Sequence, residues 1–118
     1  MDLTFDQLKP YLIPAAIAAF LLYRHIRFRL VRARLPELEK EGAVFVDVRT
    51  PAEFAAGSRP GSLNIPLDTL PAGAARLDKD KPVILCCASG ARSGMAAAIL
   101  KRQGFKKALN AGPWRNTL

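Results

Sequence analysis

The stretch VILCCASGARSGMAAA occupies residues 83–98 and joins three features whose order decides the fold. It begins with an apolar run, continues through a loop of small residues that contains Gly90, and ends in a series of helix-forming residues. This order is typical of a junction between a strand and a helix in a parallel sheet. Because ligands of such sheets bind at the carboxyl ends of the strands, the sequence predicts a functional loop here.

Outward from this stretch, short apolar runs alternate with helical segments over residues 35–118. Thr50 and Glu53, with a proline between them at the first helical position, form a capping box that predicts a helix start. Strands that are apolar throughout are typical of a parallel sheet covered on both sides. The sequence therefore predicts an α/β fold with a parallel sheet flanked by helices on both faces. The predicted strands are residues 43–48, 62–67, 82–86 and 105–111, and the predicted helices are residues 35–42, the segment after Thr50, 68–78 and 93–103.

The loop after the strand is suited to an anionic sulfur. Small side chains let successive backbone N–H groups turn toward one point, and the positive end of the following helix adds to their effect. A thiol at this point ionises more easily, because the amides and the dipole stabilise the thiolate. Cys87 is therefore the candidate nucleophile, and Arg92 offers a fixed charge for an anion.

Several motifs, taken in order, resemble the single-domain rhodanese-like sulfurtransferase family over about residues 35–114. They are Asp47-Val48-Arg49, Pro51-x-Glu53-Phe54, Gly57, Pro60-Gly61-Ser62-Leu63-Asn64-Ile65-Pro66 and Cys87-Ala88-Ser89-Gly90-Ala91-Arg92-Ser93. The resemblance implies a five-stranded parallel α/β fold. It also implies that Cys87 takes a sulfane sulfur from a small anionic donor such as thiosulfate, holds it as a persulfide, and passes it to cyanide or a thiol.

The resemblance assigns the supporting residues as well. The substrate-binding cradle is Ala88, Ser89, Gly90, Ala91, Arg92 and Ser93, and the supporting residues are Asp47, Arg49 and Glu53. We expect Arg49 and Glu53 to form an ion pair at the helix start. The sequence departs from the family pattern at Ser58-Arg59, at Gly112-Pro113-Trp114 and at Cys86, which precedes the nucleophile. The single histidine, His25, lies outside the resemblance, which excludes a Cys-His hydrolase.

Two other functions remain open from the sequence. Counted from Cys86, the loop has the C-x5-R length of cysteine-dependent phosphatases and arsenate reductases, with Arg92 as the arginine. The second alternative is a membrane-tethered module that binds an anion or a partner and has no catalytic activity. Cys86 itself is expected to be a buried strand residue, the usual state of a free cysteine.

Residues 1–34 differ from the rest in composition. Tyr11 to Tyr23 is a run of thirteen residues without a polar side chain apart from the two tyrosine hydroxyls, and five arginines follow it by residue 34. As a helix the run spans about 20 Å, and the stretch from Leu8 to Leu30 reaches a full membrane span with snorkelling cations. We predict a membrane anchor with its basic flank in residues 1–34 and a rhodanese-like domain in residues 35–118.

The arginines after the apolar run place the catalytic domain in the cytoplasm, with a single pass through a bacterial-type inner membrane and lipid contact through residues 8–30. The net charge is +8, yet the aromatic residues do not alternate with basic ones, so no nucleic-acid partner is expected. Two adjacent cysteines form neither a disulfide framework nor a tetrahedral metal site, so no metal or cofactor is expected.

Overall fold

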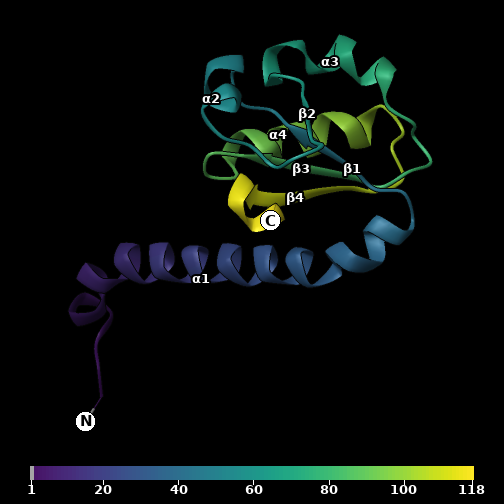
Figure 1. Ribbon diagram of the computed structural model, residues 1–118. Coiled ribbons are helices and arrows are strands. Elements are labelled where there is room, and N and C mark those ends of the chain that lie inside the picture. Colours follow the sequence, from purple (N-terminus) through teal and green to yellow (C-terminus); the bar gives the residue numbers. More distant parts are fainter. Residues whose placement is uncertain (1) are drawn as a thin grey trace.

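The computed structural model describes residues 2–118, and its sheet lies between helices (Figure 1). Within these residues the sheet has four parallel strands in the order β2-β1-β3-β4. The strands are β1 (Val44–Asp47), β2 (Leu63–Asn64), β3 (Val83–Cys87) and β4 (Ala108–Pro113). The helices are α1 (Phe5–Lys40), α2 (Pro51–Ala56), α3 (Leu70–Gly73) and α4 (Ala91–Arg102).

Both faces of the sheet are covered, as predicted. On one face Leu85 of β3 is fully buried together with Leu70 of α3 and Leu100 of α4. On the other face Ile84 packs in a second cluster with Val31, Leu35 and Leu38 from the last third of α1. The alternation of adjacent β3 residues between these clusters explains why the strand is apolar throughout.

Two predictions about the elements are wrong. Residues 35–42 do not form a separate helix, because α1 continues without a break to Lys40 and Gly42 follows with a positive φ of 86°. The resemblance implies five strands, but the sheet has four within residues 2–118. In this part of the chain α1 leads directly into β1, the first strand in sequence order. The predicted division at residue 34 therefore falls inside α1.

Three other boundaries also differ. The predicted strand at 62–67 is reduced to the two residues of β2, and the predicted helix at 68–78 is α3 with short 3-10 turns on either side. The last strand begins at Ala108 rather than at residue 105, because Phe105 packs in the core directly after the left-handed Gly104.

The helix α1 extends past the sheet at its N-terminal end (Figure 1). It is long and apolar enough to cross a membrane, and an 18-residue window with a mean hydropathy of 1.2 has none of its residues buried. Within the described chain it is the one helix with these properties. Its large apolar side chains from Leu8 to Tyr23 are exposed, whereas Val31, Leu35 and Leu38 are buried against the sheet.

Candidate active site

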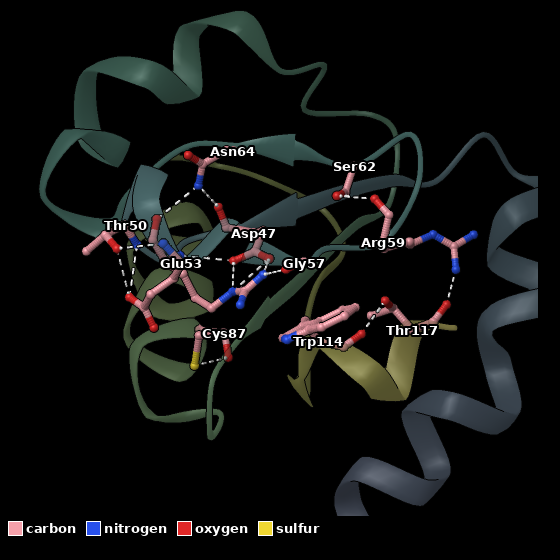
Figure 2. Close-up of polar contacts among 12 residues, drawn as sticks. Asp47, Thr50, Glu53, Gly57, Arg59, Ser62, Asn64, Cys87, Trp114 and Thr117 are labelled. Atoms are coloured by element: carbon pink, nitrogen blue, oxygen red, sulfur yellow. Dashed lines mark hydrogen bonds and ion pairs between the residues drawn. The ribbon is translucent and has the colours of Figure 1, made fainter. Parts of the chain in front are cut away.

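Cys87 is the last residue of β3, and α4 starts four residues later at Ala91. Between them the chain turns sharply at Gly90, which has a φ of 103° and caps the helix. The turn brings the Gly90 N–H to 2.9 Å from the Cys87 sulfur. Figure 2 labels Cys87 and draws its sulfur. Cys87 is fully buried beneath the loop, while Ala88 and Ser89 are exposed.

The surroundings of this sulfur favour the thiolate. Burial acts to raise the pKa of the Cys87 thiol, but hydrogen bonds from Ser93 and from the backbone of Gly90 and Ser89 outweigh it, so the pKa lies below its ordinary value. The hydroxyl of Ser93 lies 3.4 Å from the sulfur. The helix α4 begins at the loop, and its dipole adds a positive potential there.

Asn110, a residue that the sequence analysis did not identify, fastens the loop to β4. Its side-chain nitrogen donates to the Gly90 carbonyl at 2.9 Å. Its side-chain oxygen accepts from the Gly112 N–H at 2.9 Å and from the Ser93 hydroxyl at 2.6 Å. The Ser93 hydroxyl has one proton, so it serves either the amide oxygen or the thiolate. A lone asparagine in a strand gives no sequence signal for this role.

Arg92 lies on α4 and is paired with Glu53 of α2. The two guanidinium nitrogens donate to the two carboxylate oxygens at 2.7 and 2.9 Å. This pairing, with a further hydrogen bond from Thr50, lowers the pKa of Glu53 to about 2. Arg92 therefore links α4 to α2 through a bidentate ion pair with Glu53. Its contact with an anionic substrate stays a prediction.

The expected ion pair between Arg49 and Glu53 is wrong, because Asp47 is closer to the arginine along the strand end. Arg49 donates through Nη2 at 2.7 Å and through Nε at 2.9 Å to the carboxylate of Asp47 (Figure 2). Both side chains are buried, and Arg49 also donates to the Gly57 carbonyl at 2.6 Å and lies over the Trp114 ring. Through Arg49 the pair connects the end of β1 with Trp114, the first residue of the C-terminal turn (Trp114–Thr117).

Cys86 is buried on the opposite face of β3 from Cys87 and next to Asp47 in the sheet register. Burial first and the Asp47 charge second raise the pKa of Cys86 to about 12. A thiol in this state does not supply the nucleophile that a phosphatase reaction counted from Cys86 requires. Within residues 2–118, no group of three or more His, Cys, Asp and Glu side chains is placed to hold a metal ion.

The basic flank of α1 also reaches the loop, which the division into an anchor and a domain did not predict. Arg24 donates a hydrogen bond to the Ser89 carbonyl. The Phe28 ring lies so close to Gly90 and Gly112 that a Cβ atom at either position would approach it to 2.6 and 2.8 Å. Loop, strand and helix α1 therefore meet at one point.

Comparisons with known proteins identify relatives of this chain. A family model described as the rhodanese-like domain matches residues 33–112. A sulfurtransferase of Allochromatium vinosum is 42% identical over 72 residues, which cover 61% of this chain and 67% of that protein. The thiosulfate sulfurtransferase GlpE of Stutzerimonas stutzeri is 40% identical over 84 residues, which cover 68% of this chain and 77% of that protein.

Among solved structures, a rhodanese from E. coli with anions superposes with a TM-score of 0.59 at 32% identity, and the match covers 63% of this chain and 89% of that chain. The residues matched by the family model, 33–112, include the Cys87 loop. The family match extends over more than half of the 118 residues, and this chain therefore belongs to the rhodanese-like domain family.

Proposed function

We propose that this chain is a membrane-anchored sulfurtransferase that carries a sulfane sulfur on Cys87. The observation that carries the proposal is the Gly90 N–H at 2.9 Å from the Cys87 sulfur, inside a turn that starts α4. Hydrogen-bond donors already aimed at a sulfur anion stabilise both the attacking thiolate and the persulfide that replaces it. The sulfurtransferase names of the similar proteins support the same chemistry.

The reaction proceeds in two displacements. The Cys87 thiolate attacks the outer sulfur of a donor such as thiosulfate, the S–S bond of the donor breaks, and sulfite leaves with the electron pair of that bond. The resulting persulfide anion keeps one negative charge in the loop. A thiophilic acceptor, cyanide or a thiolate, then attacks the outer sulfur and restores the Cys87 thiolate.

Cys87 has no exposed surface, whereas the next two residues, Ala88 and Ser89, are exposed. A donor therefore needs a small movement of the chain beside Cys87 to reach the sulfur. Arg92, about one third exposed and paired with Glu53, lies at the start of α4.

The anchor is part of the proposal. The exposed, largely apolar section of α1 from Leu8 to Tyr23 has a length of about 24 Å, which is shorter than the hydrocarbon thickness of about 30 Å by about one helical turn. Phe28 contacts the catalytic domain instead, so lipid contact through the whole predicted range 8–30 would compete with this packing. The proposed location is a bacterial-type inner membrane, with the catalytic domain in the cytoplasm.

Mass spectrometry of the full chain after thiosulfate treatment tests the chemistry. We expect a gain of one sulfur on Cys87 that is lost when cyanide is added, with thiocyanate as the product. Cys87→Ser abolishes the gain, and the matched control Cys86→Ala retains it. Hydrolysis of a phosphate ester that Cys86→Ser abolishes, without sulfur on Cys87, would replace the proposal with a phosphatase. No modification and no turnover would indicate a binding module.

A further inference from the structure

The peptide unit between Ser89 and Gly90 makes two hydrogen bonds in opposite directions. Its N–H donates to the Cys87 sulfur at 2.9 Å, and its carbonyl oxygen accepts from the Arg24 guanidinium. In a planar trans peptide the C=O and the following N–H point to opposite sides. The arginine therefore fixes the direction of the same N–H that faces the sulfur.

The charge of Arg24 also acts through this peptide. A cation bound to a carbonyl oxygen polarises the amide, and hydrogen bonds in a chain strengthen one another. The Gly90 N–H becomes a stronger donor to an anion on Cys87. Two consecutive hydrogen bonds thus join the guanidinium, the peptide and the sulfur.

Arg24 is held in place for this contact by its own helix. Its guanidinium lies 5.3 Å from the centre of the Phe28 ring, and residues four apart in a helix share one face. The Phe28 ring packs in turn on Gly90 and Gly112. The Phe28 ring thus fixes the position of α1 against the loop. Glycine at positions 90 and 112 leaves the space that this ring occupies.

From this arrangement we infer that Arg24, in the basic flank of the anchor helix, is a positioning residue of the sulfur-transfer site. It acts through the Ser89–Gly90 peptide on the anion held by Cys87. The anchor helix therefore completes the site instead of serving only as a tether. The inference rests on the proposed role of Cys87 as the sulfur carrier.

Other charged groups surround the loop and stay constant in the test. Apart from Arg24, the charged and titratable groups described around the Cys87 loop are Cys86 on β3, Asp47 on β1 with Arg49 directly after it, Glu53 on α2 and Arg92 on α4. Arg29 lies with Arg24 in the cleft between α1 and the C-terminal turn. Arg29→Gln therefore removes an equal charge nearby and serves as the matched control.

The experiment is a pH titration of Cys87 in the full chain, monitored by the ultraviolet absorbance of its thiolate. The absorbance of the Cys87→Ser chain is subtracted at each pH. We expect Arg24→Gln to raise the midpoint by roughly 0.5 to 1 pH unit. Arg24→Lys keeps the charge and recovers part of the shift. Arg29→Gln leaves the midpoint within roughly 0.2 pH unit of the unaltered chain.

A midpoint that stays the same in Arg24→Gln, or that moves equally in Arg29→Gln, would overturn the inference. Thermal unfolding of each variant shows whether the fold is retained, and Arg24→Lys provides the second measurement if Arg24→Gln is unstable. The persulfide assay separates the two proposals. An unaltered chain that gains no sulfur contradicts the proposed function, whereas a chain that gains sulfur with an unmoved Arg24→Gln midpoint contradicts only the inference.

Discussion

Cys86 and Cys87 are adjacent, yet their surroundings shift the pKa values of the two thiols in opposite directions. Cys86 lies beside Asp47 on one face of β3, where burial and that charge raise its pKa to about 12. Cys87 lies at the strand end, where burial is outweighed by the hydrogen bonds of Ser93, Gly90 and Ser89, so its pKa is lowered. One position along the strand therefore separates a thiol that is kept neutral from a thiol whose ionised form is favoured.

The first prediction concerns Cys86 and alkaline stability. Its pKa is raised from 9.0 in the unfolded chain to about 12, so its contribution to stability is fully present below pH 9 and is lost as pH rises toward 12. Between pH 9 and 11 the free energy of unfolding of the unaltered chain should fall more steeply than that of Cys86→Ala, by up to about 1.4 kcal/mol per pH unit. Urea unfolding in detergent measures both slopes, and Cys87 contributes equally to each. Parallel slopes would contradict the expected burial of the neutral thiol.

At the scale of single residues, the sequence predicted the loop after Cys87 better than the residues that contact this loop. Cys87 was identified because its loop contains a glycine, small side chains and a helix start, and each of these has a local signature. Asn110 and Arg24 act on the same loop from residues distant in sequence, and no local pattern indicates such contacts. The partner of Arg49 was misassigned because residues two apart at a strand end, Asp47 and Arg49, pair here instead of residues four apart on a helix.

At the scale of elements, β-branched and apolar runs predicted all four strands, because a strand buried on both faces has a distinct composition. The predicted ends of these strands were less accurate where contacts with other elements decide where a strand stops. The shift of register between β3 and β4 at Leu85 and Cys86 lets β4 continue through Gly112, beyond its predicted end at residue 111. The same glycine, with a φ of 81°, lies against the Phe28 ring of α1.

The second prediction tests this contact between α1 and β4. Gly112→Ala should lower the free energy of unfolding by about 2–4 kcal/mol, because a left-handed backbone costs alanine about 1–2 kcal/mol and the overpacked ring a further 1–2 kcal/mol. In a Phe28→Ala chain the same change should cost only the backbone part. Gly104 is the matched control, since its φ is 93° and no atom lies within 4 Å of an added Cβ. Gly104→Ala should cost about 1–2 kcal/mol in both chains.

Denaturant unfolding of Gly112→Ala and Gly104→Ala, each in the chain with Phe28 and in the Phe28→Ala chain, measures the energetic coupling between the ring and each glycine. Equal costs of Gly112→Ala in the presence and absence of the ring would show that α1 does not pack on this strand in solution. A cost that depends on the ring for Gly112 but not for Gly104 would confirm the docked helix.

At the scale of the whole molecule, the 36 residues of α1 have two environments along one continuous helix. The segment up to Tyr23 exposes its apolar side chains, and the segment from Arg24 onward contacts the loop and the sheet. The sequence indicated the change in composition at this point but predicted two separate units, because composition does not show that a basic segment can pack on a neighbouring domain. The exposed apolar segment and the segment that contacts the Cys87 loop are therefore consecutive parts of one helix.

The last prediction concerns the orientation of this element in a membrane. Five arginines lie between Arg24 and Arg34, whereas the opposite end of the apolar segment has Lys9 against Asp2 and Asp6. Arginines resist translocation, so the N-terminus should lie outside the cell and the C-terminus in the cytoplasm. In a chain with Cys86→Ala and Cys87→Ser, Asp2→Cys should react with a membrane-impermeant maleimide in intact spheroplasts. Leu118→Cys, at an exposed position, should react only after lysis. Labelling of both positions, or release of the chain by a carbonate wash, would show that α1 lies outside the hydrocarbon core. The contacts of Arg24 and Phe28 with the loop would remain in that case, because they are made to protein atoms on the side of the helix that faces the sheet.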